Sequence, residues 1–385
     1  MDEPELSCTE QSGRAPRLLV SGLVLGQPAG GVRRHNAQLL PRLAKRLAAA
    51  GGGLSVLEGR APIPFPLPDC VERLRSRVPA APAPLRAAGE GPALRRALAR
   101  AAERGQPFDA VHLAHLPVPR SLPVPRTHTI HDLRALEGEH TPAHRRRTAL
   151  PILRRALGEA ALVFTVSETV AGRVRELFGV PAERMALLPN GTDHLSVAER
   201  RPRTASADSG HGYLLHIGHL EPRKNLGLLL EALAADGGLP PLVLAGAAKG
   251  DEAECLRRRA GELGVTERVV FRGPFGEDEL PGLYAAAGCL VLPSRLEGFG
   301  IPVAEAQAAG VPVAIASTPA LVEVAGPLAP AFPVDDGRAC AEAIRRALDT
   351  DAEELEAGRR RACARTWDAA ADAWFAALRG LRAGP

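Results

Sequence analysis

Short apolar runs alternate with helix-like stretches along most of this 385-residue chain. In the first unit, an apolar run over 18–25 precedes a glycine-rich loop and helical periodicity over 33–50. Units of this kind build open, mostly parallel sheets with helices on both faces. A second series of the same kind starts at residue 213. The alternation therefore predicts an α/β protein with two doubly wound domains that face a central cleft.

Changes in polarity divide the chain. Residues 1–17 are polar and lack an apolar signal core, so we expect a disordered leader there. Residues 18–195 form the predicted N-terminal domain, and 196–212 a polar linker. The predicted C-terminal domain covers 213–365, and a final helix covers 366–385. Ligands of such sheets bind at the carboxyl ends of the strands, which here predicts a site between the domains.

The region from 61 to 90 is dominated by Pro and Ala and breaks the alternation. We expect irregular structure here, with one short helix near Val71–Arg77. A longer helix is expected to follow over about Ala93–Arg104.

Composition excludes several classes of function. The formal net charge is only +4 and aromatic residues make up 3% of the chain, which argues against a nucleic-acid binder. The six cysteines form no C-x-x-C pair, so no zinc or redox motif is indicated, and their scatter favours a reducing cytoplasm. No run of 18 apolar residues predicts a membrane-spanning helix.

The most informative stretch runs from 293 to 305 and carries Glu297, Gly298, Gly300 and Glu305. It follows a predicted strand and opens a helix, whose N-terminal N–H groups can hold a phosphate. The glycines allow close approach of a ligand, and the two carboxylates can accept hydrogen bonds from sugar hydroxyls. The alternative is a plain strand–helix turn with two solvated glutamates.

Adjacent cations occupy a second turn between a strand and a helix. Arg223 and Lys224 stand beside a predicted helix N-terminus and suit a diphosphate. Lys224 is one of only three lysines in the chain. The alternative is a solvated helix cap.

Together these stretches resemble the family 4 retaining glycosyltransferases, which have the GT-B fold of two Rossmann-like domains. The Glu-x7-Glu signature is present as Glu297 and Glu305, and Pro-Arg-Lys-Asn at 222–225 is similar to the family's diphosphate loop. Four further segments resemble family motifs in the same order, namely Gly30–Val32, Thr129–Leu133, Thr165–Glu168 and Leu188–Asp193. The resemblance covers roughly residues 18–370.

The resemblance implies roles for individual residues. The N-terminal domain would take the acceptor, the C-terminal domain would bind a nucleotide sugar, and the final helix would return to the N-terminal domain. Arg223 and Lys224 would neutralise the donor diphosphate, Glu297 would contact the transferred sugar, and Glu305 the ribose. His131 would face the sugar, although a cap or core histidine is the alternative. The other implied donor-binding residues are Gly30, Gly31, Arg272, Gly273, Gly298, Phe299, Gly300 and Ile301.

The implied reaction moves a hexosyl group from a nucleoside diphosphate sugar to a hydroxyl of a glycan or lipid-linked saccharide. The His-Asp motif at Thr129–Leu133 and the stretch 317–326 resemble mannosyltransferase-like members and favour GDP-mannose as the donor. Front-face substitution with retention needs no protein nucleophile, and no metal or other cofactor is expected. The Asp-x-Asp match at Asp349–Asp351 is interpreted as a helix cap.

Two other functions remain open. Sugar-nucleotide 2-epimerases share the two-domain architecture, and a non-catalytic nucleotide-sugar-binding scaffold would keep the same motifs. A dinucleotide dehydrogenase is disfavoured because no G-x-G-x-x-G follows the first strand.

Two basic stretches, Arg33–Arg46 and His144–Arg155, raise a hypothesis of peripheral membrane contact. Arginine-rich amphipathic helices can bind anionic lipid, which would place a cytoplasmic protein at the inner face of the plasma membrane. The alternative is that both are ordinary solvated helix faces.

Overall fold

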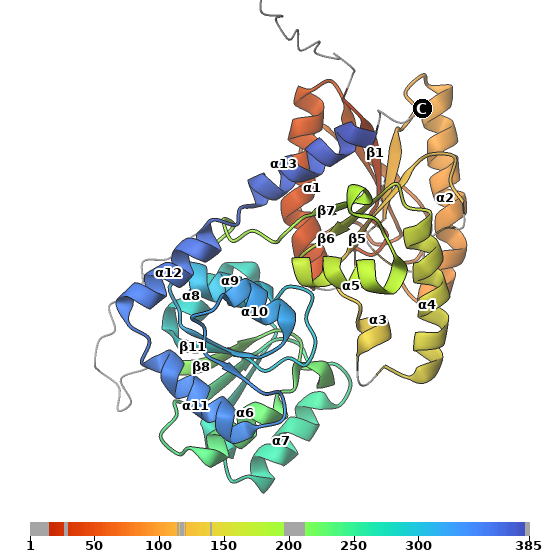
Figure 1. The fold of residues 1–385 in the computed structure, drawn as a ribbon. Coiled ribbons are helices and arrows are strands. Elements are labelled where there is room, and N and C mark those ends of the chain that lie inside the picture. The colour runs from red at the N-terminus through yellow and green to blue at the C-terminus, as the bar shows by residue number, and fades with distance from the viewer. Residues whose placement is uncertain are drawn as a thin grey trace, which may run out of the picture.

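The computed structural model in Figure 1 describes residues 15–26, 30–113, 115, 119, 121–138, 141–195 and 212–381. The expected leader (1–17) lies outside these residues except for 15–17, and the expected linker (196–212) lies outside them except for 212. Two parallel sheets organise the described chain, one in each half, as the alternation predicts.

The N-terminal sheet has seven strands in the order β3-β2-β1-β4-β5-β6-β7, and all neighbours pair in parallel. Its apolar central strands are buried, as expected for a sheet covered on both faces. The strands are β1 (Arg17–Ser21), β2 (Gly53–Glu58), β3 (Val71–Arg75), β4 (Ala110–Leu113), β5 (Arg126–Ile130), β6 (Leu162–Thr165) and β7 (Met185–Leu187).

The C-terminal sheet has six strands in the order β10-β9-β8-β11-β12-β13, again all parallel. The strands are β8 (Tyr213–Ile217), β9 (Leu242–Ala245), β10 (Val269–Gly273), β11 (Ala287–Leu292), β12 (Val313–Ala316) and β13 (Ala331–Phe332). Because β8 and β11 are neighbours, the segments that follow them meet at one edge of the sheet.

Helices connect the strands and cover the sheets. In the N-terminal half they are α1 (Gly31–Ala49), α2 (Ala83–Glu103), α3 (Arg134–Glu137), α4 (Ala143–Gly158) and α5 (Glu168–Phe178). In the C-terminal half they are α6 (Gly227–Ala235), α7 (Glu252–Glu262), α8 (Leu280–Ala286), α9 (Ile301–Ala308), α10 (Pro319–Ala325), α11 (Gly337–Leu348), α12 (Ala352–Cys363) and α13 (Trp367–Gly380).

The final helix α13 packs on the N-terminal half, beside α1 (Figure 1). Trp367 and Trp374 are fully buried there, in one apolar cluster with strand β1 and helix α1. On the outer side of this contact, Arg46 pairs with Asp368 and Asp372. The tail aromatics therefore pack, and α13 ties the two halves of the chain together.

The expectation for the Pro/Ala-rich region was wrong in two places. Residues 71–75 form the edge strand β3 and not a helix, because Val71–Arg75 pairs in register with Leu54–Glu58 of β2. Helix α2 begins at Ala83, ten residues before the expected start, with Pro82 as its N-cap. Proline is tolerated at a helix start, and the exposed side chains of β3 hide the alternation of a buried strand.

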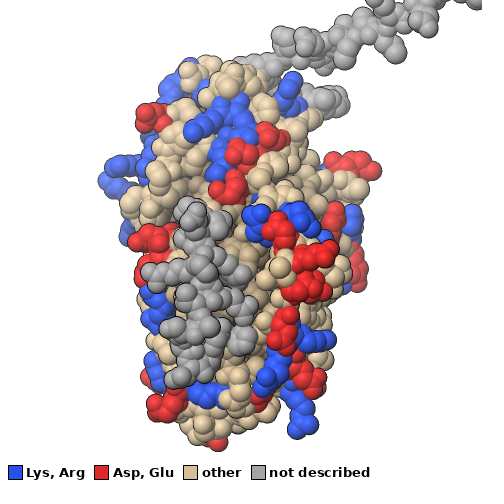
Figure 2. All heavy atoms as spheres, turned by 90° about the vertical axis from the view of Figure 1, so that its left-hand side faces the viewer, with Lys and Arg blue, Asp and Glu red and all other residues tan. Residues whose placement is uncertain are grey.

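Surface charge is mixed on the side of Figure 1 where α11 and α12 lie. Figure 2 shows acidic and basic side chains next to one another on this face, outside the grey atoms. Within the described part of the chain, no helix combines the length and the apolar character needed to span a bilayer.

Candidate functional site

A hollow between the two halves of the chain marks the cleft. It is lined by Leu133, Thr169 and Arg173 from the N-terminal half and by Glu297 and Thr318 from the C-terminal half. The loop that carries the first glutamate of the Glu-x7-Glu signature therefore borders both domains, as the sheet arrangement predicts.

Gly298 is where the two backbones approach most closely. A Cβ atom placed on it would lie 1.6 Å from the carbonyl oxygen of His131, so only glycine fits. The Ser167 hydroxyl, from the N-terminal domain, donates to the Gly298 carbonyl at 2.6 Å. We expected Gly298 to allow the close approach of a ligand. In the structure it also allows the close approach of the N-terminal domain's backbone.

The residues after Gly298 form the start of α9. Gly300 has φ 93°, in the left-handed region, and is the N-cap of this helix. The Phe299 side chain is buried in the C-terminal core, with 5% exposure. Ile301 lies across the cleft from Gly31, 3.8 Å from a Cβ atom placed on that glycine. The predicted glycine loop Gly30–Gly31 thus faces the predicted donor loop.

Two cations and a carboxylate form the first polar cluster of the site. Arg223 and Lys224 lie in a 3₁₀ turn, Pro222–Lys224, that follows β8. The Lys224 amine pairs with Glu297, and an Arg223 guanidinium nitrogen lies 3.2 Å from the other carboxylate oxygen of Glu297. Burial opposes ionisation of Glu297, but Lys224 and Arg223 outweigh it and lower its pKa to about 2. Glu297 is therefore ionised at neutral pH.

The surroundings of this cluster hold its cations in place. Arg223 also pairs with Glu221 at 2.7 Å, and Asn225 ends the turn in the left-handed region with φ 56°. Burial lowers the pKa of Lys224, and the neighbouring Glu297 opposes that change. We name the three residues Arg223, Lys224 and Glu297 the cation cluster.

Glu305 is the centre of a second polar cluster, and its side chain is fully buried. It accepts from Arg34 at 2.7 Å, from the imidazole of His194 at 3.0 Å and from the Tyr284 hydroxyl at 2.7 Å. Burial opposes its ionisation, but Arg34 and His194 outweigh it, so the pKa of Glu305 lies below the ordinary value. We name these four residues the Glu305 cluster.

The Glu305 cluster spans both domains. Arg34 comes from the first turn of α1 and also pairs with Glu277, at 3.0 Å, in the C-terminal half. The indole N–H of Trp367 donates to Nδ1 of His194 at 3.0 Å. Because an indole nitrogen can only donate, Nε2 of His194 carries the proton and donates to Glu305. Helix α13 is thereby connected to the cleft.

His131 follows β5 and stands at the cleft through its backbone contact with Gly298. Its ring meets that of His35 edge to face, with the centroids 4.8 Å apart. Burial, together with the neighbouring histidines and Arg134, lowers the pKa of His131 well below its ordinary value. A neutral His131 at the cleft is compatible both with the expected contact to a sugar and with the alternative of a core histidine.

Arg272 and Gly273 are the predicted site residues that the structure does not bring to these clusters. They end β10, the edge strand of the C-terminal sheet. Among the described residues, Arg272 contacts Pro274 and Glu279 and no member of either cluster. Neither residue has a place in the clusters described above.

Sequence reasoning missed Arg34, His194, Tyr284 and Ser167. Arg34 had a local signal, because it follows the Gly-Gly pair and lies in the first turn of a helix, where a cation is unfavourable without a partner. Ser167 lies within the family-like segment Thr165–Glu168 but received no role of its own, and His194 and Tyr284 carry no local pattern that points to the cleft.

The remaining sequence interpretations involve acidic residues. Asp351 accepts from the Glu354 amide and caps α12, which confirms the helix-cap interpretation of Asp349–Asp351. Within the described ranges, no three His, Cys, Asp or Glu side chains are grouped to hold a metal ion.

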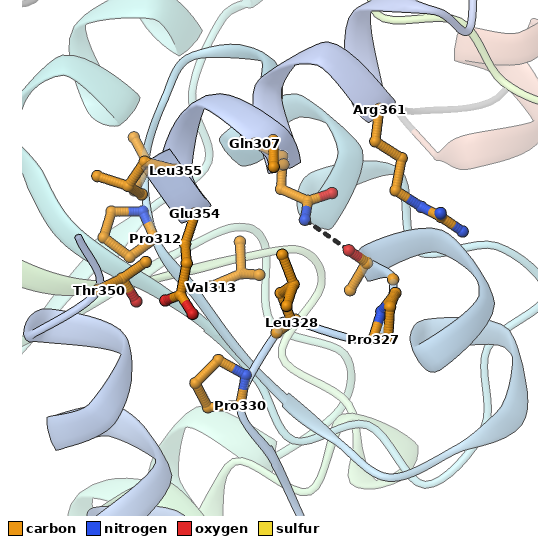
Figure 3. A pocket seen from close by; sticks show the side chains of 16 residues that line it. Gln307, Pro312, Val313, Pro327, Leu328, Pro330, Thr350, Glu354, Leu355 and Arg361 are labelled. Atoms are coloured by element: carbon orange, nitrogen blue, oxygen red, sulfur yellow. Dashed lines mark hydrogen bonds between the residues drawn. The ribbon is translucent and has the colours of Figure 1, made fainter. Parts of the chain in front are cut away.

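A second hollow lies on the far side of α9, between α12 and the segment that precedes β13 (Figure 3). Apolar side chains such as Leu328, Pro330 and Leu355 line it, and Gln307 donates to the Ala325 carbonyl at 2.7 Å. It shares no residue with the clusters of the cleft.

Family models match both halves of the chain. The model described as "Glycosyltransferase Family 4" matches residues 29–194, and the one described as "Glycosyl transferases group 1" matches residues 199–364. Each half of the chain therefore carries its own match, and the two lie in the order that the motifs predict.

Curated relatives match part of the chain. An O-antigen chain mannosyltransferase B of Escherichia coli is 36% identical over 51% of this chain and 54% of its own length. A GDP-mannose-dependent alpha-(1-6)-phosphatidylinositol monomannoside mannosyltransferase of Mycolicibacterium smegmatis is 33% identical over 43% of this chain and 47% of its own length. The chain thus spans about half the length of these relatives.

A solved structure matches nearly the whole fold. The sucrose-phosphate synthase of Thermosynechococcus elongatus superposes with a TM-score of 0.78, covering 96% of this chain and 99% of the other, at 22% identity. The GT-B architecture predicted from the sequence is confirmed.

Proposed function

We propose that this chain, which belongs to the family 4 glycosyltransferases, transfers a hexosyl group from a nucleoside diphosphate sugar to a hydroxyl acceptor. The acceptor class is a glycan or a lipid-linked saccharide. The observation that carries the proposal is the cation cluster, in which the buried Lys224 and the partly exposed Arg223 both pair with Glu297 shortly before the N-terminus of α9.

The cation cluster would hold the donor diphosphate. Arg223, Lys224 and Lys249 carry three positive charges against the two carboxylates with which they pair, Glu221 and Glu297, so one net positive charge is left for phosphate oxygens. In a water-poor cleft such fixed charges stabilise a departing diphosphate strongly, without reorganisation during the reaction. Glu297 would then be free to accept hydrogen bonds from the hydroxyls of the transferred sugar.

The glycosyl transfer can be written as a balanced reaction without a protein nucleophile. A bond forms between the acceptor oxygen and the anomeric carbon as the bond from that carbon to the diphosphate breaks. The acceptor proton passes to the leaving phosphate oxygen, on the same face, so the configuration is retained. His131, being neutral, would orient the sugar through hydrogen bonds and would not add charge.

Glu305 would bind the ribose hydroxyls of the nucleotide. Its carboxylate is ionised and already accepts from three side chains, so a ribose would replace one of them. Arg34 is the candidate for replacement, since it has a second partner in Glu277.

Mannose, carried by GDP, is the proposed donor sugar. The stretch 317–326 resembles mannosyltransferase-like sequences, and the names of two relatives specify mannosyltransferases. No metal is expected to take part, because Arg223, Lys224 and the N-terminal N–H groups of α9 can together stabilise the negative charge of the diphosphate.

Peripheral contact with an anionic membrane is proposed through α4. Arg145, Arg146 and Arg147 are exposed on this helix, and Leu150 is 37% exposed beside them. The second basic stretch contributes little, because Arg42 and Arg46 of α1 pair with acidic residues of α13. In a co-sedimentation assay, the protein should pellet with anionic vesicles and not with neutral ones. Equal co-sedimentation with both kinds of vesicle would favour a solvated helix face.

Product analysis tests the proposal. The purified protein is incubated with UDP-, GDP-, ADP- and dTDP-hexoses, a chelator and a mixture of methyl glycosides and lipid-linked saccharides. We expect nucleoside diphosphate release together with a new glycoside of retained anomeric configuration. Lys224→Ala should lower the rates of both about 10²–10³-fold. Lys45→Ala, at an exposed position on α1, should change neither.

Each alternative gives a different product. An isomerised nucleotide sugar without transfer would establish the 2-epimerase alternative. Binding of the nucleotide sugar without turnover, with every acceptor, would establish the scaffold.

A further inference from the structure

A buried carboxylate lies at the carboxyl edge of the N-terminal sheet, outside both clusters described above. Glu90, on α2, has no exposed surface. It accepts from the hydroxyl of Ser21, the last residue of β1, at 2.5 Å. It also contacts Nε2 of His115, two residues beyond β4, at 3.1 Å. Strands β1 and β4 are neighbours, which brings these residues together.

Glu90 fixes the tautomer of His115. A carboxylate can only accept, so Nε2 of His115 carries the proton and, in the neutral ring, Nδ1 presents a lone pair. This Nδ1 is buried and has no hydrogen-bond partner among the described residues, and the side chain is only 8% exposed. A buried nitrogen without a partner is costly, at about 1–3 kcal/mol, so such an atom points to a ligand.

The strand order places the end of β4 one strand away from the segment that contacts the donor loop. Strand β4 lies directly beside β5, and His131, which touches Gly298, follows β5. Neighbouring strands are about 4.8 Å apart, so the end of β4 is one strand away from the donor contact. His128 of β5 pairs with Leu113 and also has a buried Nε2 without a partner in the described chain. His115 and His128 thus each carry a buried imidazole nitrogen without a hydrogen-bond partner among the described residues, near the ends of two neighbouring strands.

We propose that His115, oriented by Glu90, binds a hydroxyl group of the acceptor sugar through Nδ1. The proposal rests on the proposed function and assigns its acceptor side. A sugar hydroxyl can both donate and accept a hydrogen bond, so it can pair with Nδ1 whether or not that atom carries a proton. We therefore assign a neutral sugar hydroxyl of the acceptor to this position.

Two substitutions separate a binding role from a structural one. His115→Gln places an amide near Nε2, keeps a donor for Glu90 and removes Nδ1. His115→Asn keeps a polar atom near Nδ1 and cannot reach Glu90. If Nδ1 binds the acceptor, the glutamine variant loses more acceptor affinity than the asparagine variant. If His115 only satisfies Glu90, the order is reversed.

The probes are the methyl α-glycosides of mannose, glucose and galactose, with binding measured by saturation-transfer NMR on the full chain. Donor affinity is measured separately with the nucleotide sugars. We expect His115→Gln to weaken glycoside binding about tenfold, which corresponds to about 1.4 kcal/mol, with unchanged donor affinity. His115→Asn should weaken it less. Thermal melts check that both variants fold.

The proposal is overturned if no glycoside binds the wild-type protein, or if His115→Gln binds glycosides as tightly as the wild type. A greater loss in His115→Asn than in His115→Gln also overturns it. Failure of the proposed function would look different, because no nucleotide sugar would then bind to any of the three proteins.

Discussion

The two polar clusters of the cleft differ in how they are built. The cation cluster takes all its residues from the C-terminal half, from the segments that follow β8 and β11. The Glu305 cluster takes Arg34 and His194 from before residue 212 and closes them on Glu305 and Tyr284. One cluster is made by a single sheet, and the other exists only where two domains meet.

This difference suggests that the cation cluster serves donor binding, whereas the Glu305 cluster is linked to the arrangement of the two domains. Strands β8 and β11 pair directly, so all three residues of the cation cluster are positioned by one sheet. The Glu305 cluster depends on the distance between α1 and α9. A ligand that bridges both clusters would therefore couple its own binding to the relative position of the domains.

Loss of the ammonium group in the cation cluster has the largest expected effect. Lys224→Ala leaves the buried Glu297 with Arg223 as its remaining cationic partner and removes a charge from the proposed diphosphate site. Removing one preorganised electrostatic group from an active site typically costs 10²–10³ in kcat, and we expect about that loss of transfer. Steady-state kinetics measure it. Wild-type turnover in this variant would show that the cation cluster takes no part in the transfer reaction.

Arg34→Ala acts on the other cluster and on the domain arrangement. It removes contacts with both Glu305 and Glu277, and breaking such a largely buried ion pair costs about 3 kcal/mol. Solution scattering should show a larger radius of gyration for Arg34→Ala and an unchanged one for Lys224→Ala. Arg96→Ala, an exposed arginine on α2, serves as the control. An unchanged radius in all three would mean that the Glu305 cluster does not hold the domains together.

Acid should distinguish the two sides of the cleft. Glu297 keeps its charge because its pKa is about 2, whereas burial lowers the pKa of His35 to about 4. An unfolded chain takes up the His35 proton below pH 6.5 and the folded chain does not. Folding stability therefore falls as the pH drops from 6.5 to 4, by on the order of 3 kcal/mol for this residue.

Denaturation followed by tryptophan fluorescence measures this loss, since the chain's two tryptophans, Trp367 and Trp374, are buried against the N-terminal half. His35→Gln should reduce the slope between pH 6.5 and 4 by the share of one histidine, because burial also lowers the pKa values of His112, His128, His131 and His216. The same slope in wild type and variant would show that His35 is not buried in its neutral form.

The smallest expected effect comes from Ser167→Ala. The Ser167 hydroxyl caps α5 through the Val170 amide and donates across the cleft to Gly298. Its loss should cost about 1 kcal/mol in stability. Asp351→Ala removes a cap of the same kind within the C-terminal half alone. Only the serine variant should also change donor affinity, as measured by calorimetry, and equal donor affinities would argue that the bond across the cleft is unimportant.

Features that depend on local sequence were predictable. Apart from β3 and β13, the strands of both sheets follow from apolar runs, and the turn with Arg223 and Lys224 follows from its place between strand and helix. Glu297 was predicted as a site residue because the loop, the two glycines and the following helix form one continuous pattern. Arg223, Lys224 and Glu297 all follow strands of the C-terminal sheet, and the pairing of those strands brings them together.

Features that depend on distant contacts were not predictable. Arg34 and Glu305 are 271 residues apart in the chain, and no spacing rule relates them. The edge strand β3 was taken for a helix because only Val71 among its side chains is fully buried. The contact of Glu90 with Ser21 and His115 likewise arises from the pairing of β1 with β4, and no local signal marks it.

The most direct test of the central claim is calorimetric titration of the wild type and Lys224→Ala with UDP-, GDP-, ADP- and dTDP-sugars in the presence of a chelator. We predict saturable binding of one nucleotide class to the wild type, strongest for GDP-mannose, and its loss in Lys224→Ala. Absence of binding to the folded wild type, or equal binding by the variant, would contradict the assignment of the cation cluster as the donor site.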